Sequence, residues 1–180
     1  DVKNESRLWI ENPMTGYEIM ANQGGASRTM TSWLRWLAGW LDDEQVVCAT
    51  KESITEDYFE LTPINDVSGD VESLVIKLSE TKAVVVESRR FDPAFDRKSP
   101  NSKNGLLVYT VDATKGSAQG NQALLSPRDI TQYIEERTWR GGQELDAVFF
   151  QGDSVVVDGL KIEAYSIGKD SDVVKVTRLD

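Results

Sequence analysis

The residues of this 180-residue chain that could do chemistry are mainly carboxylates, because the sequence contains no histidine. Catalytic zinc in peptidases is held mainly by neutral imidazoles, so this chain unaided is not expected to hydrolyse peptides with a histidine-bound zinc. Asp92, Asp96 and Asp112 could together hold calcium, which prefers clustered oxygen ligands. Their spacing is not that of an EF-hand, however, and loop acids usually do no more than face solvent. Calcium binding and simple solvation are therefore both kept as interpretations.

Glu87 and Arg89 stand two residues apart in an apolar segment of strand length, so their side chains should share one face of a strand. This spacing favours a structural ion pair, or a hydrogen-bonded strut to the neighbouring strand. The single cysteine, Cys48, lies in the apolar run 46–49. We expect it to be buried as a small apolar side chain, with a bridge to a cysteine elsewhere in a longer precursor as the alternative.

Three tryptophans recur at helical spacing. Trp33, Trp36 and Trp40 would lie on one face of a helix over about 32–41, with Thr31 or Ser32 as its N-terminal cap. Such a face is typical of a buried core, and we expect these rings to be structural. The alternative is a ligand platform, which would require the rings to be exposed side by side.

The remaining sequence indicates a mainly β fold. Apolar segments of strand length occur at 74–78, 83–89, 105–111, 154–157, 160–165 and 173–176. Asp158 and Gly159 form a strong two-residue hairpin signal between two of them. Short strands at this spacing predict an antiparallel β-sandwich. We therefore divide the chain into a loop and short-helix segment, 1–45, and a sandwich domain, 46–180.

Composition excludes some partners. The formal net charge of −10 argues against nucleic acid, since no basic stripe is available to neutralise phosphates. No segment has the roughly 20 apolar residues of a membrane span. Because the first residue is aspartate, we expect a processed product or part of a longer protein.

Four blocks of this sequence resemble, in the same order, the immune inhibitor A-like secreted zinc metallopeptidases. Residues 17–20, ending in Met20, resemble the methionine turn beneath the zinc site, and residues 33–42 resemble the tryptophan-led helix that closes the catalytic domain. Residues 83–90 are similar to the family's strand ending in Glu-x-Arg. Residues 105–112 are similar to its Gly-Val-Leu-Ile-Trp-His-Val-Asp strand. The chain departs from the family in two respects: the His-Glu-x-x-His segment is absent, and Thr110 stands where histidine is common.

The resemblance implies the C-terminal portion of such a protein, extracellular or at the cell surface. It is equally compatible with a proteolytic product of a larger peptidase and with a relative that has lost catalysis and kept the scaffold. Segment 1–45 would be the remnant of the catalytic domain, with Met20 supporting the metal site from below. The zinc of the parent protein, its ligands and the general base would belong to a missing N-terminal segment or to another chain. The alternative is a free-standing extracellular β-sandwich module for adhesion, surface assembly or ligand binding.

Overall fold

The computed structural model describes residues 14, 17–18, 29–66, 70–92, 104–116, 119–127 and 147–179. These residues contain one α-helix, α2 (Ser32–Leu37), and the short 3-10 helices η1 (Asp43–Gln45) and η2 (Lys51–Ser53). The described strands are β1 (Val46–Thr50), β2 (Glu56–Leu61), β3 (Ser73–Lys77), β4 (Lys82–Arg89), β5 (Gly105–Asp112), β6 (Gln122–Leu124), β7 (Val148–Phe149), β8 (Ser154–Val157), β9 (Leu160–Ile167) and β10 (Asp172–Arg178).

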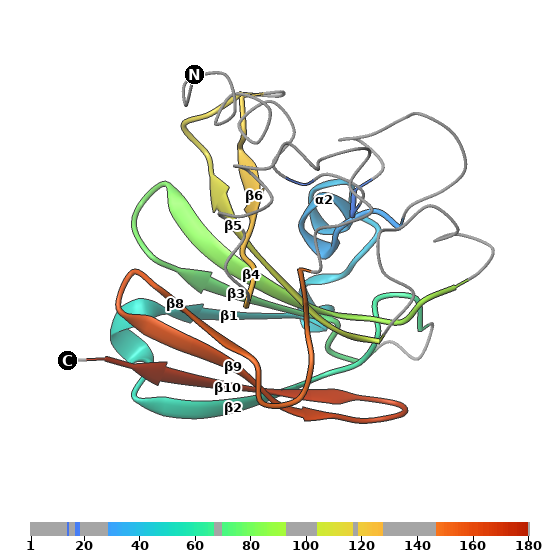
Figure 1. Cartoon of the computed structure of the whole chain (residues 1–180). Helices are drawn as coiled ribbons and strands as arrows, with labels where there is room; N and C mark the ends of the chain where they lie inside the picture. Colours follow the sequence, from blue (N-terminus) through green and yellow to red (C-terminus); the bar gives the residue numbers. More distant parts are fainter. Residues whose placement is uncertain are drawn as a thin grey trace, which may run out of the picture.

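The described strands form two stacked sheets (Figure 1). The first has the order β1-β3-β4-β5-β6, with β7 also pairing with β5, and the second has the order β2-β10-β9-β8. Neighbouring strands are antiparallel, except that β1 and β3 run parallel. The fold is therefore mainly β and consistent with a β-sandwich, as the sequence predicts. No helix among the described residues is long and apolar enough to cross a membrane.

The core between the sheets is formed by alternate residues of the strands, because successive side chains of a strand point to opposite faces. Its members are apolar and almost fully buried. They are Ile54, Leu61, Leu74, Ile76, Val84, Val86, Leu106, Val108, Phe149, Leu160, Ile162, Ala164, Val174 and Val176.

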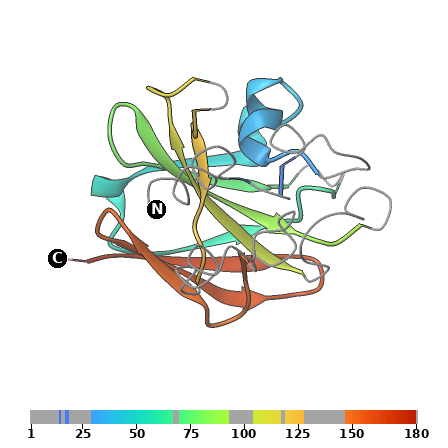
Figure 2. The ribbon, with the colours of Figure 1, turned by 45° about the horizontal axis from the view of Figure 1, so that its top comes forward.

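The first sheet is buried on its other face as well. Helix α2 lies on the side of this sheet that faces away from the second sheet (Figures 1 and 2). A second apolar cluster fills this layer and includes Val75, Val85, Leu107 and Tyr109. Burial on both faces explains why β4 is apolar over consecutive positions, Val84 to Val86, whereas the strands of the second sheet alternate.

Helix α2 ends at Leu37, earlier than the predicted end near residue 41. Gly39 has a φ of +69°, its N–H donates to the carbonyl of Trp36, and the N–H of Trp40 donates to the carbonyl of Arg35. This pair of bonds is a Schellman motif, which stops a helix by satisfying its last carbonyls. Trp40 therefore lies beyond the helix.

Replacing Gly39 with alanine should lower the free energy of unfolding by about 1 kcal/mol, because a side chain at positive φ is strained. Urea denaturation measures this difference. Gly39→Asn is the matched control and should cost less, since asparagine tolerates the left-handed conformation. An alanine variant as stable as the parent would contradict this account of the helix end.

Two further predictions have opposite outcomes. The hairpin at Asp158 and Gly159 is confirmed: both residues have positive φ, 48° and 76°, and they join antiparallel β8 and β9. The expected burial of Cys48 is wrong, because its side chain is exposed. Strand β1 is the edge of its sheet, and the second apolar cluster reaches Val46 on the same face but not Cys48.

Candidate functional site

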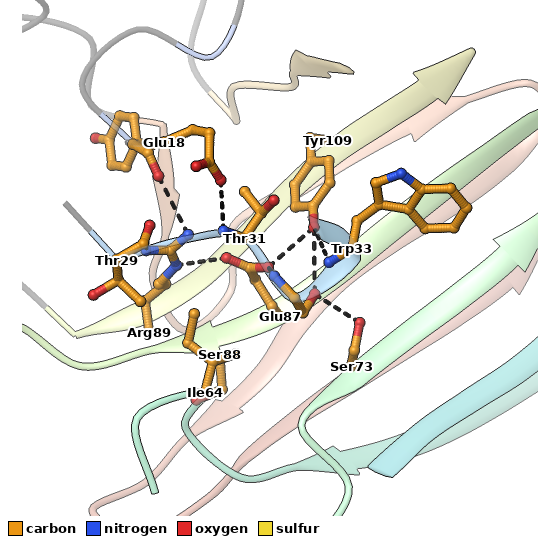
Figure 3. A network of polar contacts seen from close by, with 12 residues as sticks. Glu18, Thr29, Thr31, Trp33, Ile64, Ser73, Glu87, Ser88, Arg89 and Tyr109 are labelled. Atoms are coloured by element: carbon orange, nitrogen blue, oxygen red, sulfur yellow. Dashed lines mark hydrogen bonds and ion pairs between the residues drawn. The ribbon is translucent and has the colours of Figure 1, made fainter. Parts of the chain in front are cut away.

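A buried cluster of polar side chains lies on the outer face of the first sheet, beneath the residues that lead into α2 (Figure 3). Strands β3, β4, β5 and β6 supply one half of the cluster, and Glu18 together with the segment around 29–33 supplies the other. Its members are Glu18, Thr29, Thr31, Ser32, Ser73, Glu87, Arg89, Tyr109 and Gln122.

Glu87 is the centre of this polar cluster. Its side chain is fully buried, and one carboxylate oxygen, Oε1, accepts from Arg89 Nε at 2.5 Å. The other oxygen, Oε2, accepts from the backbone N–H of Ser32 at 2.7 Å and from the Tyr109 hydroxyl at 3.0 Å. Three donors, one of them cationic, compensate the desolvation of a carboxylate. The ion pair that the two-residue spacing favours is present.

Arg89 joins Glu87 to the chain before the helix. One terminal nitrogen, Nη1, donates to the carbonyl of Thr29 at 3.1 Å, and Nη2 donates to the carbonyl of Tyr17 at 3.3 Å. These two carbonyls lie 60 and 72 residues away in the sequence. The Glu87–Arg89 pair thus fastens an early segment of the chain to the sheet.

Helix α2 begins on side chains of the sheet. The first N–H groups of a helix have no partner within the helix, and a serine or threonine cap usually supplies one. Thr31 makes no such capping bond. Instead, the N–H of Ser32 donates to Glu87, and the N–H of Trp33 donates to the Tyr109 hydroxyl at 3.2 Å. The predicted local cap is therefore wrong, and the sheet replaces it.

The Tyr109 hydroxyl takes part only as a neutral group. Burial, followed by the nearby charge of Glu87, raises the pKa of Tyr109 well above its ordinary value. A phenol held neutral can donate to Glu87 while it accepts from the helix, but it is not poised to act as a base. Its role is to position the chain.

The remaining contacts extend the cluster along the same segment. The N–H of Thr31 donates to Glu18 Oε2 at 2.5 Å, and its hydroxyl donates to Gln122 Oε1 at 3.2 Å. The hydroxyls of Ser32 and Ser73 lie 2.8 Å apart. The described part of segment 1–45 is thus bound to the sheet by buried polar contacts as well as by apolar packing.

Glu72 lies at the edge of this cluster and differs from the other carboxylates. It is buried, its Oε1 accepts from Gln45 Nε2 at 3.0 Å, and its Oε2 has no hydrogen-bond partner. Burial raises the pKa of Glu72 to about 7; Arg35 opposes this rise, while Asp66 and Glu87 add to it. The guanidinium of Arg35 donates to the carbonyl of Ile64 and, at 3.5 Å, to Asn65 Oδ1, so no direct ion pair with Glu72 is formed.

The two sheets are also joined by a polar contact that sequence reasoning missed. Asp172, at the start of β10, is fully buried and accepts from Ser88 at 2.8 Å and from both terminal nitrogens of Arg90 at 2.9 and 2.8 Å. It also accepts from the N–H of Gly168 at 3.1 Å. These hydrogen bonds hold the turn before β10 close to the end of β4.

The register of β4 and β5 does not bring together two of the three acids considered for calcium, Asp92 and Asp112. Asp112 pairs with Lys82 at one end of these strands, whereas Asp92 follows Arg89 at the other end; the stretch from Lys82 to Arg89 alone spans roughly 23 Å at the usual rise per residue. Asp112 instead accepts from the N–H and hydroxyl of Thr114, at 3.0 and 2.6 Å, which lowers its pKa. Asp96 and Met20 lie outside the described residues. No group of three acidic or sulfur ligands that could hold a metal occurs within the described ranges.

The tryptophan face is only partly core. Trp33 and Trp36 are half-buried, pack against the second apolar cluster and contact each other edge to face, with centroids 5.7 Å apart. The prediction that Trp40 is buried is wrong: Trp40 is 67% exposed, and Leu37, the last residue of α2, is 65% exposed. The physical reason is the helix end at Gly39, which carries Trp40 off the sheet.

The described cluster therefore holds chain segments together, since the oxygens of Glu87 are already occupied by donors from the protein. Comparisons of the chain with protein-family models, curated proteins and solved structures found no match. Any inference about function therefore rests on the sequence and on the geometry of the described residues.

Proposed function

We propose that this chain is the non-catalytic supporting part of a secreted metallopeptidase-like protein, extracellular or at the cell surface. In this proposal, the sandwich holds a polypeptide segment on the outer face of its first sheet and presents it to a catalytic half. No histidine is available here as a zinc ligand, so the zinc ligands and the general base belong to that other half or to another chain.

The observation that carries the proposal is the course of the tryptophan face. It starts on the sheet at Trp33 and Trp36, anchored by the buried polar contacts of Glu87 and Tyr109. Further along the chain, Leu37 and Trp40 are exposed to solvent. A helix that is firmly anchored at one end, with large apolar side chains exposed at the other, fits a surface that another polypeptide covers.

The direct test compares the intact mass and metal content of the natural gene product with those of this chain. A longer product that contains zinc would support the proposal. A product of this length that contains no zinc would contradict it and favour the free-standing module.

A matched pair of variants tests the exposed surface itself. Replacing both Leu37 and Trp40 with serine should reduce the fluorescence of a dye that binds exposed apolar surface by about half or more, because two large exposed apolar side chains are lost. The dye is excited directly, so that energy transfer from tryptophan does not contribute. The control replaces Tyr58 and Tyr165 with serine, since these large side chains are also exposed, at 49% and 51%, but lie on the second sheet. Equal losses in the two variants would contradict a special role for the helix end.

One observation favours the second candidate, a free-standing module for adhesion, surface assembly or ligand binding. Tyr58 and Tyr165 are exposed neighbours on the outer face of the second sheet, with ring centroids 5.1 Å apart. Lys175 Nζ lies 5.5 Å from the Tyr58 centroid. This tyrosine pair would be the binding surface in that case. The variant that lacks both tyrosines would then lose more dye fluorescence than the variant that lacks Leu37 and Trp40.

A further inference from the structure

Glu72 joins two elements that are distant in sequence, β3 and η1. It precedes β3, its backbone N–H donates to the carbonyl of Gln45 in η1 at 2.9 Å, and its carboxyl accepts from the side chain of the same glutamine. Gln45 Oε1 in turn accepts from the N–H of Asp42 at 3.0 Å. One glutamine side chain therefore fixes the turn after α2 and also reaches the buried carboxyl.

The charged groups that face Glu72 do not neutralise it by direct contact. Arg35 of α2 faces it, but donates to the loop after β2. Asp66 of that loop and Glu87 of β4 are like charges. Oε2 of Glu72 is buried without a hydrogen-bond partner, which for an ionised carboxylate is a large desolvation cost and for a protonated one a much smaller cost.

We propose that Glu72 is a proton-operated latch, in which protonation of Oε2 holds η1 and the end of α2 against β3, and ionisation loosens that attachment. The proton belongs on Oε2 because Oε1 is the acceptor for Gln45. When the carboxyl ionises, hydration of its unpaired oxygen becomes strongly favourable in free energy. The cheapest route to water is a local opening that separates η1 from β3, because the rest of β3 is paired on both sides.

The pKa of about 7 places the response of this latch around neutral pH. The opened state should titrate near the ordinary glutamate value of 4.5. Linkage of these two values predicts that the ratio of open to closed molecules rises about tenfold between pH 6 and pH 8. The inference does not depend on the proposed function, since it concerns only how the helix segment is held.

The experiment follows the wild-type chain by NMR. The side-chain carboxyl carbon of Glu72 should titrate with a midpoint near 7, and a midpoint below 5 would overturn the proposal. In parallel, the amide protection of Glu72, whose N–H is bonded to Gln45, is measured between pH 6 and 8 and corrected for the intrinsic exchange rate. Protection should fall by about tenfold over this range.

Two variants separate the latch from general charge effects. Glu72→Gln keeps the shape and removes the ionisation, so the corrected protection should no longer depend on pH. Glu44→Gln is the control, because Glu44 is an exposed acid of the same η1 turn and its loss should leave the pH dependence intact. Equal pH dependence in the wild type and Glu72→Gln would overturn the proposal.

Discussion

Replacing Glu87 with alanine is expected to lower the free energy of unfolding by about 3–5 kcal/mol, the cost of breaking a buried ion pair by removing one partner. The change leaves Arg89 buried without its anion, and it deprives the N–H of Ser32 and the hydroxyl of Tyr109 of their acceptor. Because two of these donors hold the start of α2, the helix segment should be the first part to loosen.

The chain offers a matched control for this prediction. Lys161 and Glu163 also form an ion pair at 2.7 Å between residues two apart on one strand, but their side chains are 41% and 25% exposed, whereas those of Arg89 and Glu87 are 9% and 0% exposed. Glu163→Ala should cost less than about 1 kcal/mol, since exposed pairs are weakened by solvent and side-chain entropy. Both variants are measured by urea denaturation at the same pH and salt. Similar losses in the two variants would mean that Glu87 contributes no more than a surface charge.

Most strands could be predicted because their signal is local. The apolar segments at 83–89 and 105–111 correspond closely to β4 and β5, and the Asp158–Gly159 turn fixes the register of β8 against β9. Strand β2 gave no such signal, because three of its six residues are acidic and it forms an edge of the second sheet. The pairing of β6 and β7 with β5 depends on contacts distant in sequence.

Within the polar site, only contacts between residues close in sequence could be predicted. The spacing of Glu87 and Arg89 indicates their ion pair, since both belong to one strand. Glu72 and Tyr109 carry no comparable signal: their importance comes from burial and from partners 27 and 22 residues or more away. The expectation for Trp40 failed for a local reason that the sequence does contain, namely Gly39, whose left-handed conformation ends the helix.

These observations assign different roles to two buried glutamates, Glu87 in β4 and Glu72 directly before β3. Glu87 is compensated by a cation and two neutral donors, so its charge is part of the stable structure. Glu72 has one neutral donor and an oxygen without a partner, so its charge opposes the folded state. The same helix segment is thus held by one carboxylate whose hydrogen-bonding needs the protein meets and by another, Glu72, that is favoured in its protonated form.

The stability of the protein should accordingly fall as the pH rises through neutrality, by an amount that Glu72 supplies. Its pKa is raised from 4.5 to about 7 on folding, so the folded state binds the proton more tightly than the unfolded chain does. The contribution is fully present below pH 4.5 and is lost as the pH rises through 7. A shift of this size corresponds to at most about 3 kcal/mol, which solvent screening reduces, and most of it is lost between pH 5 and 8.

Urea denaturation of the wild type and of Glu72→Gln at pH 5, 6, 7 and 8 measures the contribution of Glu72 to the free energy of unfolding. The other titrating groups are common to both proteins, so their contributions cancel in the difference. The variant should gain stability relative to the wild type by up to about 2.5 kcal/mol from pH 5 to pH 8. A difference that is independent of pH would show that Glu72 ionises alike in the folded and unfolded chains. In that case its unpartnered oxygen must reach water without any opening of the turn, and the contrast with Glu87 would reduce to a difference in packing alone.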